Sequence, residues 1–251
     1  MRYPPRHRLG GYLFAAQPID LGKGLVSLPL MRGERHPDSE ALARIGADVR
    51  HRLANERTVR QAQVNAAEIY IVENFLPADA CDRLTRLIDA VACPSRLVEE
   101  DDWAGYRTSY SGDIDPADAT VRALESQLNC LTGLDTARSE CAQGQRYLTG
   151  EYYHEHCDWF DTAANYWPHE DGNGGQRSWT AMVYLNTVEL GGHTDFIKLD
   201  LRVRPQPGTL LLWNNACPDG SPNPWTLHAA RPVERGVKYV VTKWYRARNW
   251  Q

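Results

Sequence analysis

The chain has 251 residues, of which 42% are hydrophobic and 24% are charged, and its formal net charge is −4 at pH 7. This composition is ordinary for a folded globular protein and excludes a low-complexity or collagen-like chain. The slightly acidic balance and the lack of a long basic run give no attraction to nucleic acid or to an anionic membrane surface, so we expect neither partner.

The cysteine pattern and the hydropathy exclude several further classes. Six cysteines are scattered without a C-x-x-C pair, so the sequence contains no zinc-knuckle or thioredoxin-like motif. No stretch approaches the ~20 apolar residues that a membrane span requires. The arginines near Met1 are not followed by the apolar run of a signal peptide. We therefore expect a soluble protein located in the cytoplasm.

Residues 1–68 are expected to form an N-terminal arm and helix that pack on a core domain of residues 69–251. The first 35 residues are rich in Gly, Pro and Arg, which predicts irregular structure. From Asp38, apolar residues at helical spacing predict a helix, and a polar helical stretch is expected to continue to about Ala67. The apolar face of this helix consists of Leu42, Ile45, Val49 and Leu53.

One strand and two more helices are predicted next. The run Ile69-Tyr-Ile-Val72 predicts a strand, and helices are predicted to begin near Pro77 and after Asp115-Pro116. The apolar stripes of these two helices are Leu84, Leu87, Ile88 and Val91 in the first, and Val121, Leu124, Leu128 and Leu131 in the second.

After about residue 140 the pattern changes to short strands separated by Gly, Pro and Asn turns. The predicted strands are 146–153, 178–185, 194–197, 201–203, 209–213, 226–229 and 237–245. The polar segment 157–175 is expected to be a surface loop near a cavity mouth. Because helices come first and strands second, we expect a mainly β protein, a barrel or jelly roll buttressed by the N-terminal helices.

A histidine and a carboxylate two residues apart, His156-x-Asp158, fall on the same face of an extended strand and can share one metal ion. His228, on a late predicted strand, is a candidate third ligand. Two histidines and one carboxylate form the facial arrangement of non-haem Fe(II) oxygenases. A competing interpretation uses His154-x-His156 with His228 for zinc or nickel.

Lys238 follows His228 by ten residues, and the Pro and Gly of 231–236 predict a hairpin between them. A lysine buried near a metal needs an anionic partner, and a dicarboxylate cosubstrate that chelates the metal at its other end meets that need. Strand alternation places Lys238, Val240, Thr242 and Trp244 on the same inward face.

Taken together, these segments resemble the prolyl 4-hydroxylase branch of the 2-oxoglutarate/Fe(II) dioxygenases over roughly residues 69–247. The order and spacing of the segments carry the resemblance. The matching segments are Asn74-Phe-Leu-Pro-Ala-Asp79, Tyr106-Arg-Thr-Ser109, Arg146–Tyr153 leading into His156-Cys-Asp158-Trp-Phe160, Gln176-Arg-Ser-Trp-Thr180 with Tyr184-Leu-Asn186, Gly191-Gly-His-Thr194-Asp-Phe196, Thr226-Leu-His228 through Val233, Gly236-Val-Lys238 and Thr242-Lys-Trp244.

The resemblance implies a double-stranded β-helix core, a jelly roll of the cupin-like kind, and roles for nine residues. It implies iron ligands at His156, Asp158 and His228, 2-oxoglutarate contacts from Lys238, Thr180 and Tyr153, and a substrate groove lined by Arg107, Tyr147 and Trp244. A regular strand would place Tyr153 and His156 on opposite faces, so the Tyr153 assignment requires a bend between them, and Tyr147 has the same parity as Tyr153. His193 stands where the family usually has an acidic residue after the glycine pair.

The implied activity is hydroxylation of an unactivated C–H bond with Fe(II), 2-oxoglutarate and O2, and with ascorbate as a candidate reductant. The leading expectation for the substrate is a prolyl residue in a peptide or protein. Two alternatives stay open: the same chemistry on a free amino acid, imino acid or natural-product precursor, and a non-catalytic cupin-like metal-binding module.

Overall fold

The computed structural model describes residues 36–95 and 105–251. The predicted irregular arm of residues 1–35 lies outside this part of the chain. Among the described residues, no helix is long and apolar enough to cross a membrane.

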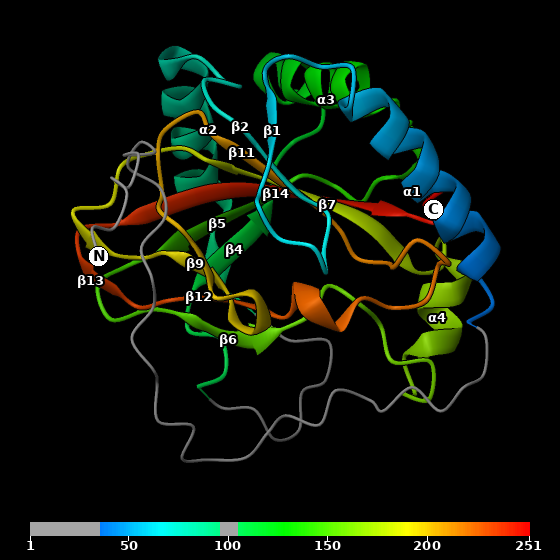
Figure 1. Cartoon of the computed structure of the whole chain (residues 1–251). Coiled ribbons are helices and arrows are strands. Elements are labelled where there is room, and N and C mark those ends of the chain that lie inside the picture. The colour runs from blue at the N-terminus through cyan, green and yellow to red at the C-terminus, as the bar shows by residue number, and fades with distance from the viewer. Residues whose placement is uncertain (1–35, 96–104) are drawn as a thin grey trace, which may run out of the picture.

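An eight-stranded antiparallel sheet forms the centre of the molecule (Figure 1). Its strands pair in the order β1 (Val59–Gln61), β2 (Ile69–Val72), β11 (Leu210–Asn214), β7 (Arg177–Tyr184), β14 (Lys238–Arg246), β5 (Gln143–Tyr147), β4 (Tyr110–Asp113) and β3 (Cys93–Pro94). β7, β11 and β14 are buried along almost their whole length, as expected of strands covered on both faces.

A four-stranded antiparallel sheet faces one side of the eight-stranded sheet, and a short two-stranded ribbon lies beside it. The four strands pair in the order β10 (Leu201–Val203), β9 (Thr194–Phe196), β12 (His228–Ala230) and β6 (Tyr153–His156), and the ribbon is β8 (Leu190–Gly191) with β13 (Val233–Arg235). Side chains of both larger sheets meet in one hydrophobic cluster, which includes Ile71, Tyr184, Phe196, Trp213 and Val240. The expected jelly-roll architecture is confirmed.

Helices cover the other side of the eight-stranded sheet (Figure 1). They are α1 (Ser39–Leu53), α2 (Ala78–Val91) and α3 (Ala119–Thr132). Their buried residues join the alternate residues of the sheet in a second hydrophobic cluster. Along β7, for example, Trp179, Ala181 and Val183 pack in this second cluster, whereas Met182 and Tyr184 point into the first. The period of two therefore divides the core into a helix side and a cavity side.

Most predicted elements are present with bounds shifted by one or two residues. The predicted helices and the strand 69–72 correspond to α1, α2, α3 and β2. The alternation along β14 is confirmed, because Val240 packs in the cluster between the two sheets whereas Val241 and Tyr245 pack in the helix-side cluster. Val91, expected on the buried stripe of α2, is 41% exposed at the last turn of that helix.

Four expectations about local structure are wrong. The polar helical stretch to Ala67 does not form, because α1 ends at Leu53 and β1 pairs with β2 instead. The predicted strand 146–153 is two strands in different sheets, since Gly150 adopts a φ of 88° and the Glu151 carboxylate accepts a hydrogen bond from the Leu148 backbone N–H. The loop 157–175 contains a short helix, α4 (Trp167–Gly172). The hairpin 228–238 is not a hairpin: β12 and β14 lie in different sheets, and β13 between them pairs with β8.

The packing of α2 on β5 generates a test of the helix-side core. Ile88 is fully buried, and Gly144 of β5 leaves room for it, since a Cβ there would lie 2.3 Å from Ile88 Cγ1. We expect Ile88→Ala to lower the free energy of unfolding by about 2–5 kcal/mol, because it removes buried methyl groups and leaves a cavity. Urea denaturation measures the loss. Val91→Ala on the same helix is the control and should cost under about 1 kcal/mol, so equal losses for the two variants would refute this account of the core.

Candidate metal centre and active site

The three predicted metal ligands come together at one end of the four-stranded sheet. His156 is the last residue of β6, His228 is the first residue of β12, and the two are direct partners in the antiparallel register. Asp158 follows β6 by two residues and is 4% exposed. One ligand atom from each side chain lies within 4.8 Å of the others, and residues 36–95 and 105–251 contain no second group of this kind.

Hydrogen bonds fix which nitrogen of each imidazole faces the carboxylate. His156 Nδ1 lies 2.8 Å from the His154 carbonyl oxygen, and His228 Nδ1 lies 2.9 Å from the Thr226 carbonyl oxygen. Because a carbonyl oxygen only accepts, each Nδ1 donates its proton, so the neutral form of each ring carries its lone pair on Nε2. Each Nε2 lies 4.0 Å from an oxygen of Asp158. The site thus presents the Nε2 atoms of two imidazole rings and one carboxylate.

The electrostatics of the site favour the metal-binding protonation states. Burial, together with the neighbouring His228 ring, lowers the pKa of His156 to about 3, so its imidazole is neutral at physiological pH. Burial acts in the opposite direction on Asp158, because it disfavours the charged form. The nearby His228, His156 and Arg177 outweigh burial, and the pKa of the Asp158 carboxyl lies below its usual value.

Side chains of the eight-stranded sheet hold the segment that carries Asp158. The Thr180 hydroxyl on β7 donates to Asp158 Oδ2 over 2.8 Å. Gln176, fully buried just before β7, accepts from the Phe160 backbone N–H and donates to the Phe160 carbonyl. These contacts tie the residues after β6 to the start of β7. The predicted role of Thr180 towards 2-oxoglutarate stays a prediction, and in the structure its hydroxyl proton is directed at Asp158.

A β-bulge brings Tyr153 to the same side of β6 as His156. The register pairs His228 with His156 and Ala230 with Tyr153, so three steps along β6 oppose two steps along β12. The extra residue provides the bend that the Tyr153 assignment requires. As a result the Tyr153 ring stacks on the His156 ring, with 3.6 Å between centroids and 15° between planes. The Arg107 guanidinium also contacts Tyr153, at 4.9 Å from the ring centroid.

Lys238 lies inside the core, and no residue in the described ranges 36–95 and 105–251 forms an ion pair with it. It is 1% exposed, and its Nζ lies 5.2 Å from the Tyr147 ring centroid and 5.6 Å from that of Tyr184. The nearest carboxylate that influences it, Asp195, is already paired with Arg202 and Arg231. Burial lowers the pKa of Lys238 to about 7. Tyr147, predicted to line the substrate groove, therefore stands on the Lys238 side of the cavity.

Arg177 is a site residue that the sequence reasoning did not identify. Its Nε and Nη2 donate to both oxygens of Glu140, and its Nη1 lies 3.9 Å from Asp158 Oδ1. Its guanidinium lies 4.2 Å from the ring centroid of Trp244. A bulge opposite Tyr245 and Arg246 breaks the alternation of β7 between Arg177 and Trp179, which turns Arg177 towards the cavity. An arginine at the start of an otherwise apolar strand was the one signal in the sequence.

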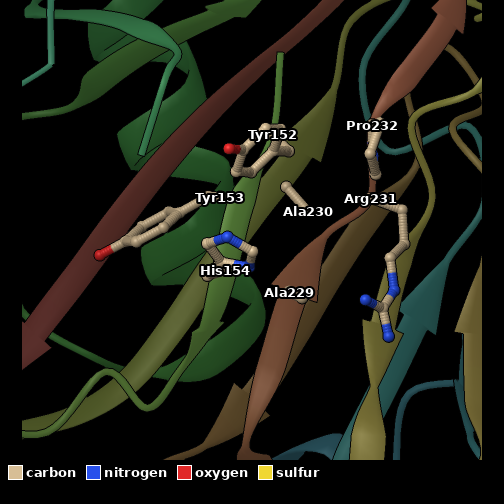
Figure 2. Close-up of a pocket in the computed structure, with 7 residues that line it drawn as sticks. All are labelled: Tyr152, Tyr153, His154, Ala229, Ala230, Arg231 and Pro232. Carbon is tan, nitrogen blue, oxygen red and sulfur yellow. The ribbon is translucent and has the colours of Figure 1, made fainter. Parts of the chain in front are cut away.

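His154 belongs to a different surface from the triad. It lines a pocket of about 140 Å³ beside β6 and β12, shown in Figure 2, together with Tyr152, Ala229 and Arg231. Its ring packs against Tyr152 at a centroid distance of 4.8 Å, and its Nδ1 lies 3.6 Å from Glu155. The alternative in which His154 and His156 share a metal is therefore not supported by the geometry. His193, on the loop between β8 and β9, is half-buried and is not a member of the triad.

Comparison with known proteins identifies the family. Residues 142–246, which span β5 to β14 and contain the triad and Lys238, match the family model of the 2OG-Fe(II) oxygenase superfamily. Probable prolyl 4-hydroxylase 3 of Arabidopsis thaliana is 28% identical over 250 residues, covering 89% of this chain and 85% of the relative. The chain belongs to the 2OG-Fe(II) oxygenase superfamily. It is a prolyl 4-hydroxylase-like member, as the resemblance predicted.

Other relatives of the oxygenase agree in sequence and in fold. Prolyl 4-hydroxylase subunit alpha-1 of Gallus gallus is 33% identical over 147 residues, which are 58% of this chain and 28% of that subunit. The viral collagen prolyl hydroxylase of Paramecium Bursaria Chlorella virus-1, solved as a 2OG complex, superposes with a TM-score of 0.55 at 27% identity and covers 70% of this chain and 94% of that one.

The donor set of the oxygenase fits Fe(II). Two imidazole Nε2 lone pairs and a carboxylate, with the remaining side of the metal position free of further ligand groups among the described residues, match the facial triad. The oxygenase is thus a 2-oxoglutarate- and Fe(II)-dependent dioxygenase. When bound, iron with 2-oxoglutarate and O2 supplies the oxidising chemistry that places oxygen on a carbon.

Removal of one ligand tests the metal centre. We expect Asp158→Asn to weaken Co(II) binding by about 100-fold or more, because the amide replaces the charged ligand without changing its shape. The visible absorption of bound Co(II) reports the binding. His154→Ala is the control and should bind Co(II) as the parent does. Loss of binding in the His154 variant, with Asp158→Asn unaffected, would restore the alternative site.

Lys238 gives the oxygenase a pH dependence whose sign follows from its pKa. The folded value of about 7 lies below the ordinary lysine value of about 10.4, so between these pH values the unfolded chain binds a proton that the folded protein lacks. This residue therefore makes the free energy of unfolding rise with pH across that window, by at most about 1.4 kcal/mol per pH unit. Lys238→Met should abolish this contribution to the pH dependence. Chemical denaturation of parent and variant between pH 7 and 10 measures the free energy of unfolding that decides this.

A ligand experiment checks the same residue independently. With Mn(II) present, 2-oxoglutarate should raise the melting temperature of the parent, since its carboxylate pairs with the lysine. The Lys238→Met variant should need about 10- to 100-fold more 2-oxoglutarate for the same stabilisation. A parent and variant that respond equally to 2-oxoglutarate would show that Lys238 does not meet the cosubstrate.

Proposed function

We propose that this oxygenase hydroxylates a prolyl residue in a peptide or protein. The observation that supports this most directly is the alignment with the Arabidopsis prolyl 4-hydroxylase, which covers nearly the whole of both chains. In this proposal His156, Asp158 and His228 hold the iron, and Lys238 pairs with the far carboxylate of 2-oxoglutarate. The cosubstrate then lies between the triad and the Tyr147 and Tyr184 rings that surround the lysine.

The substrate is proposed to approach from the side of the triad that lies away from Lys238. Arg107 and Tyr153 form a row that ends on the His156 ring, and Arg177 lies over Trp244 beside Asp158. Aromatic faces suit the apolar ring of proline, and guanidinium groups suit the carbonyl oxygens of a peptide. Trp244 Nε1 is buried and has no hydrogen-bond partner in the described part of the chain, so it is a further donor for a peptide carbonyl.

The protein's own contribution in this proposal is binding, orientation and exclusion of water. Tyr153, packed face to face on His156, shields one side of a metal ligand from solvent. Arg177 and Trp244 would hold the target carbon in place against the metal position. No side chain has to act as a nucleophile, because the bond to oxygen is made by the cofactor chemistry.

Succinate release with matched substrates tests the proposal. The protein, loaded with Fe(II) under anaerobic conditions and then given O2, 2-oxoglutarate and ascorbate, is offered a proline-rich peptide, the same peptide with alanine for proline, and free L-proline. We expect succinate release to rise with the proline peptide alone, and mass spectrometry to find one added oxygen atom on a proline. Asp158→Ala is the inactive control.

The other outcomes select the alternatives. Stimulation by free L-proline with the peptide untouched would indicate a hydroxylase of amino acids or of natural-product precursors. Metal binding without succinate release across a broad panel of peptides and amino acids would indicate a non-catalytic cupin-like module.

A further inference from the structure

A chain of hydrogen bonds runs from the metal-binding carboxylate into the eight-stranded sheet. Asn215 Nδ2, just after β11, donates to Thr180 Oγ1 over 3.0 Å, and Thr180 Oγ1 donates to Asp158 Oδ2 over 2.8 Å. Asp158, Thr180 and Asn215 are 4%, 0% and 2% exposed. The three side chains are therefore shielded from water, where hydrogen bonds hold geometry more strongly than at the surface.

The donor at the end of this chain sets the direction of the hydrogen bonds. A threonine hydroxyl has one proton and two lone pairs. Because Asn215 donates to one lone pair of Thr180, the hydroxyl proton remains for Asp158. If the Asn215 amide were turned by half a rotation, its oxygen would compete with Asp158 for that proton.

The orientation of Asn215 leaves a polar atom unsatisfied. Asn215 Oδ1 is buried and has no hydrogen-bond partner among the residues that the structure describes. Such a group costs about 1–3 kcal/mol. The backbone of Asn215 is held on both sides, since its N–H donates to the Ser178 carbonyl and its carbonyl accepts from the Asn223 N–H. The fold thus fixes Asn215 where its amide donor faces Thr180, at a cost to stability.

We propose that Thr180 and Asn215 are positioning residues that fix the rotation of the Asp158 carboxylate and thereby set the metal affinity of the site. Thr180 donates to Asp158 Oδ2 and keeps the carboxylate turned so that Oδ1 lies 4.0 Å from His156 Nε2 and Oδ2 lies 4.0 Å from His228 Nε2. Asn215 acts through Thr180 and touches no metal ligand in its hydrogen bonds. The inference rests on the metal centre of the proposed function.

This role differs from a contact between Thr180 and 2-oxoglutarate, and the two can be separated by measurement. A cosubstrate contact affects the affinity for 2-oxoglutarate and leaves the affinity for the metal alone unchanged. A positioning role affects the metal affinity in the absence of 2-oxoglutarate. Substitutions of groups that orient metal ligands typically weaken metal binding or activity by about 10- to 100-fold.

The direct test is Mn(II) binding to the full chain in the absence of 2-oxoglutarate. The electron paramagnetic resonance signal of free Mn(II) measures how much of the metal is bound. Thr180→Val has nearly the same shape as threonine without the hydroxyl, and we expect its dissociation constant to rise about 10- to 100-fold. Thr180→Ser keeps the hydroxyl and should stay within about threefold of the parent. Thermal unfolding without metal confirms that each variant is folded.

A second substitution tests the relay itself. Asn215→Leu removes the donor to Thr180 at similar volume, and we expect it to weaken Mn(II) binding about 3- to 10-fold in the parent. In the Thr180→Val background the same substitution should have no further effect, because the hydroxyl through which Asn215 acts is gone. A purely structural role of Asn215 would instead give additive losses.

Several results would overturn the inference. Parent-like Mn(II) affinity in Thr180→Val, or equal losses in Thr180→Ser and Thr180→Val, would remove the role of the hydroxyl. If Thr180→Val does not fold, the test rests on Asn215→Leu. A parent-like affinity of Asn215→Leu for Mn(II) would then overturn the inference. A parent that binds no Mn(II) would refute the metal centre and with it both proposals, whereas a parent that binds Mn(II) and responds to neither substitution would refute the inference alone.

Discussion

The pairing of His156 on β6 with His228 on β12 is the contact on which the site depends. Because the two strands run antiparallel in one sheet, two residues 72 positions apart in the sequence become direct neighbours. The carbonyls of His154 and Thr226, each two residues before a histidine, then set the tautomers of both rings. Asp158 lies only two residues after the end of β6, which brings its carboxylate close to both histidines. The pairing of β6 with β12 therefore positions the two histidines, and the neighbouring backbone carbonyls set the tautomer of each ring.

The sequence predicted the triad and Lys238 because each depends on features that a sequence displays. His156-x-Asp158 has the spacing of one strand face, and Lys238 lies on a long strand whose alternation is regular through Trp244. Tyr153 and Arg177 were harder, because each lies at a β-bulge and alternation fails there. The resemblance to a family led us to expect Tyr153 on the same side of β6 as His156, but nothing in the spacing of β7 turns Arg177 inward. The position of a bulge depends on the register with the neighbouring strand, so it cannot be predicted from the sequence of one strand alone.

The errors in secondary structure have two origins. The predicted strand 146–153 has continuous β-forming residues, and Gly150 with a left-handed φ divides it into strands of two sheets. The stretch after Leu53 has a helical composition, but the edge of the eight-stranded sheet takes residues 59–61 as β1. At residues 59–61 tertiary pairing outweighed local propensity, whereas at Gly150 a local turn interrupts residues that otherwise favour a strand. Asn215 was missed for a related reason, since its partner Thr180 is on a different strand.

Residues 106–108 pair with the outer edge of β6 and so affect how another polypeptide chain can bind there. β6 is the last strand of its sheet, and an edge strand with free N–H and C=O groups recruits strands from other molecules. Here the Thr108 N–H donates to the Tyr152 carbonyl and the His154 N–H to the Tyr106 carbonyl, so residues 106–108 occupy that edge. The strand that carries a metal ligand is thereby closed to strand addition and to edge-to-edge aggregation. In the proposed function, a peptide would not pair with this edge of β6, so side chains such as Arg107 would have to supply the contacts there.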